Sequence, residues 1–320
     1  MGDSLKLEGI IPPIATPFTK SGEIDFEALK EEARFLANTG VSGLVVGGSG
    51  GEGYAMSAHE LREATSAVKS TVRKIRGDGF PVLAGVIRNS TREAIEYASA
   101  AKEGGADGLQ MTPFPVYLYR PYIEDLVEGF REVGATVGLP IVIYNVVPTN
   151  KISARDFRKM SSVEQVVAIK HSGIDIHALG DVILEVGDRF TILSALDDML
   201  LPSFVLGVKG AICGASMMLP DMCVEMFRLY RQGRVEECVP IHWKIFRVVR
   251  ATMHRGPNDI FPDMIGRIKF AITAQGRYVG YMRAPMSLPG DEARAEILAA
   301  LKASGRPTDP ALEQDSQQIV

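Results

Sequence analysis

Short runs of apolar, β-branched residues alternate along much of this chain with longer stretches of helical periodicity. The units repeat at roughly 30-residue intervals, the length of a strand and a helix that returns the chain to the next parallel strand. We expect eight strands, at residues 9–14, 42–47, 81–87, 108–112, 140–145, 166–170, 190–194 and 209–213. Eight such units predict an α/β fold, the closed (β/α)8 TIM barrel.

The segments between these runs are typical of amphipathic helices. In the segment that begins at residue 26, Leu29, Ala33 and Leu36 share one face, and Gly40 supplies a stop signal. A dinucleotide-binding sheet is less well supported, because no Gly-x-Gly-x-x-Gly follows an expected strand.

After about residue 220 the strand pattern stops, and helices are predicted at 220–232, 234–253, 262–275 and 291–303. We therefore expect a barrel that carries the active site at 1–220, a C-terminal helical domain at 221–305 and a loose polar tail at 306–320. In the second of these helices, one face is expected to hold Trp243, Ile245, Phe246 and Val249.

Charge and composition exclude several classes of partner. The formal net charge is −4, which offers no basic footprint for nucleic acid or anionic lipid. No stretch of about 18 apolar residues suggests a membrane span, and the first residues lack the pattern of a secretory signal. The three cysteines form no Cys-x-x-Cys pair. We expect a soluble cytoplasmic protein with reduced thiols.

In a barrel of this type the chemistry lies where the strands end. Lys170 follows the apolar run Val166–Ile169, so strand alternation places it inside the barrel near the mouth. An amine there loses hydration, which favours its neutral, nucleophilic form. A lysine that forms an ion pair at the rim is the alternative interpretation.

Tyr144 ends the preceding expected strand, 26 residues before Lys170 in the sequence. Neighbouring strands of a barrel would bring its phenol close to the amine, where it could donate and accept protons. A core tyrosine with no chemical role is the alternative.

A glycine-rich loop, residues 47–53, follows the second expected strand. Its backbone N–H groups and the Ser49 hydroxyl could hold a carboxylate or a phosphate. It is not a P-loop, because no Gly-Lys-Ser/Thr follows. The alternative is a flexible turn before a helix in which Ser57 and Glu60 form a capping box.

Taken together, these segments resemble the dihydrodipicolinate synthase / N-acetylneuraminate lyase family of class I aldolases, from about residue 9 to residue 304. The matching motifs are Ala15-Thr16-Pro17-Phe18, Gly22-Glu23-Ile24-Asp25, Gly48-Ser49-Gly50-Gly51-Glu52, Tyr144-Asn145-Val146-Val147-Pro148, Ile169-Lys170, Gly210-Ala211-Ile212-Cys213-Gly214 and Arg283-Ala284-Pro285-Met286.

The resemblance implies a (β/α)8 barrel with C-terminal helices, assembled as a homotetramer, a dimer of dimers. It implies no metal and no organic cofactor. Lys170 would form an imine with pyruvate or another 2-oxo acid, and Tyr144 would transfer protons. Ser49 and the Gly50 amide would hold the carboxylate, and Ile212 would contact the substrate.

Several positions depart from the family pattern. Gly50 stands where a second Thr relays protons, so that relay is missing or rebuilt. The Arg that binds a second carboxylate in the lysine-pathway synthases is absent, and only Lys151 could compensate. The second Tyr of a Thr-Pro-Tyr-Tyr segment, which crosses the dimer interface, is also missing; Tyr117 or Tyr119 could replace it. We assign no role to His171.

These departures favour aldol cleavage, aldol addition or dehydration of a hydroxylated or deoxy-sugar 2-oxo acid. The alternatives are 4-hydroxy-tetrahydrodipicolinate synthase, a non-catalytic barrel that binds a small acid, and a phosphate-binding barrel that uses Gly207 and 210–214.

Metal hydrolysis is disfavoured because the five histidines do not pair at strand ends. Asp197 and Asp198 are expected to cap the next helix.

Overall fold

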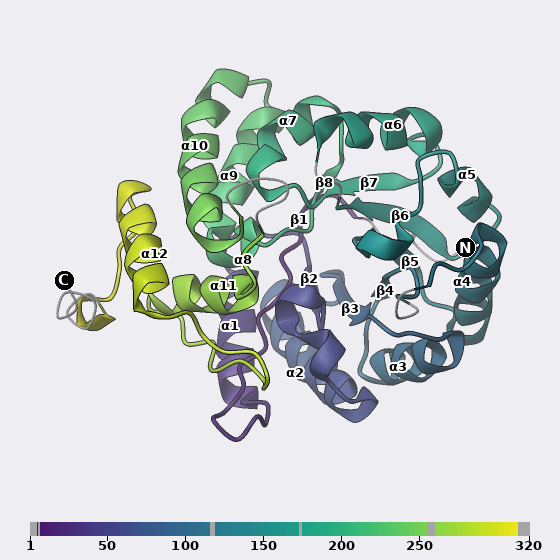
Figure 1. The fold of residues 1–320 in the computed structure, drawn as a ribbon, viewed down its shortest axis with the longest axis horizontal. Helices are drawn as coiled ribbons and strands as arrows, with labels where there is room; N and C mark the ends of the chain where they lie inside the picture. Colours follow the sequence, from purple (N-terminus) through teal and green to yellow (C-terminus); the bar gives the residue numbers. More distant parts are fainter. Residues whose placement is uncertain (1–4, 6, 116–118, 173–174, 255–259, 313–320) are drawn as a thin grey trace.

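A computed structural model describes residues 5, 7–115, 119–172, 175–254 and 260–312. Its centre is a parallel sheet in which the strands from β2 to β8 pair in chain order, and β1 pairs with β8. The strands are β1 (Gly9–Ile10), β2 (Leu44–Val46), β3 (Val82–Val86), β4 (Gly108–Met111), β5 (Ile141–Asn145), β6 (Val166–His171), β7 (Thr191–Ser194) and β8 (Gly210–Ala211). Figure 1 shows the sheet curled inside a ring of helices, as expected for a (β/α)8 barrel.

The segment just after β1 closes the barrel. Val45 of β2 donates its N–H to Pro12 O and accepts from the Ile14 N–H, and Pro13 forms a parallel bridge with Val45. Pro12 and Pro13 have no N–H to donate, so the hydrogen-bond ladder is broken there. This is why the expected strand at 9–14 is reduced to two residues in regular pairing.

Helices cover the outside of the sheet. Ser57 and Glu60 form the capping box that the sequence offered at the start of α2, and at the start of α3 the Ser90 side chain accepts from the Glu93 N–H. The helices around the barrel are α1 (Phe26–Ala37), α2 (Ala58–Arg76), α3 (Thr91–Glu103), α4 (Ile123–Val137), α5 (Phe157–Met160), α6 (Ile176–Val186), α7 (Leu200–Val205) and α8 (Ala215–Met218).

A separate apolar cluster fills the barrel interior. It contains Leu7, Ile11, Val45, Leu83, Val142, Ala168, Leu193 and Ile212. Because side chains alternate along a strand, Tyr144 and Lys170 follow Val142 and Ala168 on the same inward face, one step closer to the mouth. The interior therefore forms an apolar floor beneath these two residues.

Four longer helices follow the last strand: α9 (Pro220–Arg231), α10 (Val235–Thr252), α11 (Met264–Thr273) and α12 (Asp291–Ala303). In Figure 1 they extend from one side of the barrel, and α10 packs against α9 and α12. None of the helices in the described ranges is long and apolar enough to cross a membrane.

Two details of this region differ from expectation. Trp243 is 56% exposed, whereas Ile245 and Val249 are fully buried. The buried face of α10 runs through 238, 242, 245 and 249 at helical spacing, so Trp243 projects away from it. The first residues of the predicted loose tail are held in place: Asp309 donates its N–H to Ala274 O.

Candidate active site

The two residues singled out at the strand ends lie side by side. Tyr144 of β5 and Lys170 of β6 are partners in the parallel register. Lys170 Nζ lies 3.5 Å from the centroid of the Tyr144 ring, and the two residues are 3% and 6% exposed. The ring face is electronegative and stabilises a cation, while the buried setting limits hydration of the amine. The predicted proximity of Lys170 and Tyr144 is confirmed.

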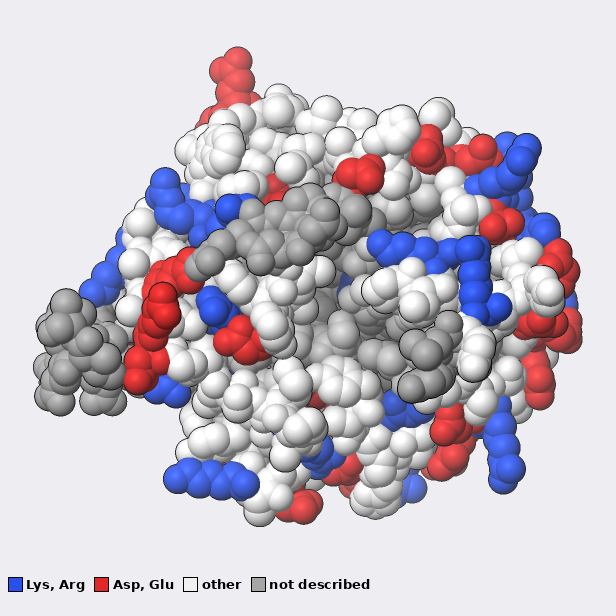
Figure 2. Space-filling view, viewed as in Figure 1, with Lys and Arg blue, Asp and Glu red and all other residues white. Residues whose placement is uncertain are grey.

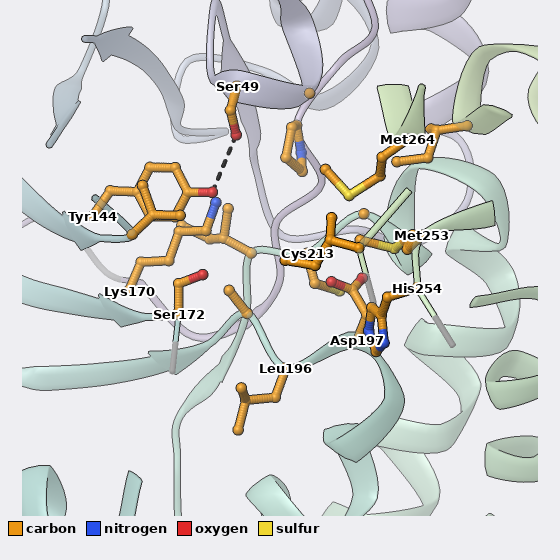
Figure 3. Close-up of a pocket in the computed structure, with 18 of the residues that line it drawn as sticks. Ser49, Tyr144, Lys170, Ser172, Leu196, Asp197, Cys213, Met253, His254 and Met264 are labelled. Atoms are coloured by element: carbon orange, nitrogen blue, oxygen red, sulfur yellow. Dashed lines mark hydrogen bonds between the residues drawn. The ribbon is translucent and has the colours of Figure 1, made fainter. Parts of the chain in front are cut away.

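The hydroxyl of Tyr144 points to the glycine-rich loop. Its oxygen lies 3.1 Å from Ser49 Oγ, within hydrogen-bonding distance. Figure 3 shows Ser49, Tyr144 and the Lys170 amine converging at one end of a cavity. Three strand ends, β2, β5 and β6, therefore bring a hydroxyl, a phenol and an amine to one point.

The loop after β2 folds tightly, and its glycines make this possible. It forms two short 3-10 turns, η1 (Ser49–Gly51) and η2 (Gly53–Ala55). A Cβ on Gly53 would lie 1.7 Å from Gly47 O, and one on Gly85 of β3 would lie 2.1 Å from the same oxygen. No larger residue fits at either place without moving backbone, so the two glycines fix the path of the chain that presents Ser49.

Glu52 anchors this loop from inside the protein. It joins the two turns in the left-handed conformation, with a φ of 55°. Its Oε1 lies 2.6 Å from Lys269 Nζ, and Oε2 accepts the Arg283 N–H at 3.0 Å. Lys269 is fully buried and also donates to Thr16 O and Tyr281 O. Burial lowers the pKa of Lys269, and the charge of Glu52 opposes that shift.

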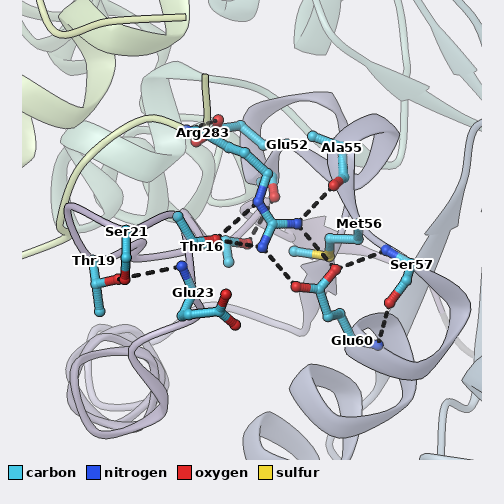
Figure 4. Close-up of polar contacts among 12 residues, drawn as sticks. Thr16, Thr19, Ser21, Glu23, Glu52, Ala55, Met56, Ser57, Glu60 and Arg283 are labelled. Carbon is cyan, nitrogen blue, oxygen red and sulfur yellow. Dashed lines mark hydrogen bonds and ion pairs between the residues drawn. The ribbon is translucent and has the colours of Figure 1, made fainter. Parts of the chain in front are cut away.

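Arg283 holds the other side of the loop. Its guanidinium donates to Gly22 O, Ala55 O and the Glu60 carboxylate. Figure 4 shows this side chain between the turn at 19–23 and the start of α2. The late Arg-x-Pro motif is thus part of the scaffold of the glycine-rich loop and does not reach the cavity lining.

Asp197 is placed differently from expectation. It does not cap the helix that follows it; its Oδ1 accepts the N–H of Ala215, at the start of α8. Burial raises the pKa of this carboxyl from 3.8 to about 6, although the hydrogen bond from Ala215 and the charge of Lys170 oppose the shift. Because the parallel strands all end at the same edge of the barrel, Asp197, which follows β7, lies beside the start of α8, which follows β8.

The cavity around these groups has a volume of about 470 Å³. Ser49, Gly50, Tyr144, Lys170 and Ile212, which were all predicted from the sequence, line it. Figure 2 shows this face of the molecule hollowed near its centre, with mostly uncharged side chains around the hollow.

Lys151 also lines the cavity, so the loop after β5 does bring a cation to the site. Asn145 organises this loop: its side chain accepts the Ile152 N–H and donates to Ile152 O, each at 2.9 Å. Lys151, the residue that could compensate for the missing Arg, therefore lies at the edge of the site, and its role as a carboxylate ligand stays a prediction.

His171 and Tyr119 do not line the cavity. His171 is buried away from it, and burial lowers its pKa to about 4, so it is neutral near pH 7. Tyr119 is 71% exposed, and Tyr117 lies outside the described residues. Within the described ranges, no group of three or more His, Cys, Asp or Glu side chains could hold a metal ion.

The sequence from residue 6 to residue 304 matches the model of the dihydrodipicolinate synthetase family. The chain belongs to this family. Its members are lyases of the aldolase type, so the protein is an enzyme of this class. Schiff-base chemistry with pyruvate and tetrameric assembly are typical of the family.

Curated relatives match over nearly their whole length. The 4-hydroxy-tetrahydrodipicolinate synthase of Methanocaldococcus jannaschii is 32% identical over 308 residues, which cover 93% of this chain and 99% of the relative. That of Methanothrix thermoacetophila is 31% identical over 293 residues, with 90% and 94% covered.

Solved structures agree. YagE, an E. coli K12 prophage protein of the dihydrodipicolinic acid synthase family solved in complex with pyruvate, superimposes with a TM-score of 0.85. It is 26% identical, and the match covers 94% of this chain and 99% of YagE.

Proposed function

We propose that the enzyme forms a Schiff base between Lys170 and pyruvate or a related 2-oxo acid, and uses it for aldol addition, aldol cleavage or dehydration. The observation that carries this proposal is the position of Lys170 Nζ, 3.5 Å from the Tyr144 ring centroid at the polar end of the cavity. An amine, a phenol and a hydroxyl at one point are the groups that imine formation requires.

Each residue has a defined part in the proposed reaction. The neutral amine of Lys170 attacks C2 of the 2-oxo acid, and the former carbonyl oxygen gains protons and leaves as water. The Tyr144 hydroxyl donates and recovers protons, and Ser49, bonded to it, orients it. Ser49 and the backbone N–H groups of the loop hold the substrate carboxylate.

The protonated imine then withdraws electrons from C3. Loss of a proton from C3 gives an enamine, which can add to an aldehyde; the reverse steps cleave a 4-hydroxy-2-oxo acid. Elimination of a hydroxyl as water uses the same electron sink. A hydroxylated 2-oxo acid is therefore the substrate class that we propose.

Borohydride trapping tests the Schiff base directly. Reduction in the presence of pyruvate or other 2-oxo acids should add the mass of the reduced adduct to one lysine, and peptide mapping should place it at Lys170. Lys170→Ala should abolish trapping, whereas Lys151→Ala, which alters another lysine of the same cavity, should retain it. Adduct on a different lysine, or none with any acid, would refute the proposal.

Lysine-pathway synthesis is the second candidate, and Lys151 favours it because a cation lines the cavity. Lysine provides a point charge and not the planar, two-pronged contact that arginine makes with a carboxylate. Losing a charge-assisted contact of that kind costs about 1.5–3 kcal/mol, or roughly ten- to more than hundredfold in selectivity. We therefore expect poor condensation of pyruvate with aspartate semialdehyde. A coupled assay against a neutral aldehyde at equal concentration tests this.

A further inference from the structure

One side of the cavity is apolar and is built by the C-terminal helices. Met264, Ile265 and Ile268 come from the first turns of α11, Met217 comes from α8, and Met253 follows the end of α10. Figure 3 shows Met253 and Met264 across the cavity from Tyr144 and Lys170. Substrate held at Lys170 would extend toward this side.

This apolar surface begins next to the proposed reaction centre. A Cβ on Gly50 would lie 2.7 Å from Met217 Sδ, so the thioether occupies the space that a side chain at position 50 would need. In the family pattern that side chain is a threonine with a relay hydroxyl. Here position 50 has no side chain, and the space beside it is filled by Met217, a residue type that packs well against irregular apolar and aromatic groups.

The charges on the same side disfavour an anionic partner. Asp197 and Asp198 are the carboxylates among the described lining residues, and His254 Nε2 lies 3.9 Å from Asp198 Oδ2. Asp197 already accepts the Ala215 N–H. A second carboxylate would meet like charge here, and hydroxyls placed against methionine and isoleucine side chains would lose hydrogen bonds to water.

The cavity has room for a larger substrate than a three-carbon acid. Its 470 Å³ falls within the range of about 300–1,000 Å³ that holds drug-sized ligands. Pyruvate bound at Lys170 would leave the helical side of the cavity empty. The remaining space is therefore available to a substituent of the second substrate.

We propose that the electrophile is an aldehyde with a bulky apolar substituent, aromatic or branched aliphatic, that packs against Met217, Met264 and Ile268. The proposal rests on the Schiff-base function argued above. The enamine carbon C3 bonds to the aldehyde carbon, the aldehyde oxygen gains a proton, and water then releases the 4-hydroxy-2-oxo acid from Lys170. Cleavage runs through the same steps in reverse.

Cleavage of three 4-hydroxy-2-oxo acids that differ only in the C4 substituent tests this choice on the unmodified protein. The substituents are phenyl, isobutyl and dihydroxyethyl, and released pyruvate is measured with lactate dehydrogenase. Each buried methylene contributes roughly fourfold, so the phenyl and isobutyl acids should exceed the dihydroxyethyl acid by at least about tenfold in kcat/KM.

A variant pair tests the surface itself. Met264→Gln should lower kcat/KM for the phenyl acid by about five- to tenfold, with less than a threefold change for the dihydroxyethyl acid. Met222→Gln is the matched control, because Met222 on α9 is also partly buried but does not line the cavity. Borohydride trapping of pyruvate at Lys170 should be retained in both variants.

The outcomes separate the two proposals. If trapping at Lys170 is intact but the dihydroxyethyl acid is preferred, the apolar electrophile is refuted and the Schiff-base function stands. Equal loss of all three activities in Met264→Gln also refutes the apolar contact. If no 2-oxo acid is trapped by the unmodified protein, the Schiff-base function fails, and the apolar electrophile fails with it.

Discussion

Replacing Tyr144 with phenylalanine separates a chemical role from a structural one. The variant keeps the ring, so the contact between its centroid and Lys170 Nζ at 3.5 Å is preserved. It removes the hydroxyl that lies 3.1 Å from Ser49 Oγ. Tyr144 is 6% exposed and no group grows larger, so the core is expected to keep its packing.

The two roles differ in magnitude. A neutral hydrogen bond contributes about 0.5–1.5 kcal/mol, so the free energy of unfolding should fall by no more than that. A general acid–base group typically contributes about 10²–10⁴-fold in rate, which corresponds to roughly 3–5 kcal/mol of activation free energy. The loss of kcat should therefore exceed what the lost hydrogen bond alone explains.

The assay compares kcat, KM and urea unfolding for Tyr144→Phe and for a matched control, Tyr97→Phe. Tyr97 also takes part in one hydrogen bond, which it donates to Met56 O at 3.1 Å, and it does not line the cavity. Both variants should lose similar stability, but only Tyr144→Phe should lose turnover and borohydride trapping rate. Unchanged kcat in Tyr144→Phe, or an equal loss in both variants, would show that Tyr144 is a core residue.

Three further changes have defined outcomes. As the pH rises from about 4 to about 6, Asp197→Asn should gain up to about 3 kcal/mol in free energy of unfolding relative to the unmodified protein, because the raised pKa of Asp197 makes its ionisation in the folded state costly. Unfolding at several pH values measures this difference, and a difference that does not change with pH would contradict the prediction. Lys269→Met should lower the free energy of unfolding by about 3–5 kcal/mol, because it leaves Glu52 buried without its partner. Adding Glu52→Gln to the same chain should restore part of that free energy, and no restoration would contradict the importance of the pair. Lys151→Met should lower kcat/KM for aspartate semialdehyde more than for a neutral aldehyde, and equal effects would exclude Lys151 as a carboxylate ligand.

The parts of the site that the sequence predicts are those fixed by strand register. Lys170 and Tyr144 lie one residue before the ends of neighbouring parallel strands, so alternation alone places both inward and at the same height. Ser49 follows a third strand, and its loop lies at the same edge. The local sequence pattern is enough to predict the positions of these residues, because every βα unit of the barrel repeats the same geometry.

Contacts between distant segments could not be predicted in this way. Glu52 and Lys269 form a buried pair across most of the chain, and no local period connects them. Lys269 lies in an apolar helix, where a lysine would ordinarily face water. The hydrogen bond from Ala215 to Asp197 could not be predicted for a similar reason. A carboxylate after β7 can accept from any N–H at the edge where the strands end, and the local sequence does not say which one.

The pairing of Glu52 with Lys269 joins the two halves of the cavity. The reactive half is presented by strand ends and by the loop that Glu52 anchors, whereas the apolar half comes largely from α11, which carries both Lys269 and Met264. A shift of α11 would therefore move the wall that we propose selects the aldehyde and would disturb the loop that presents Ser49. Substitutions that enlarge α11's cavity-facing side chains are thus expected to raise KM for the 2-oxo acid as well as change aldehyde preference.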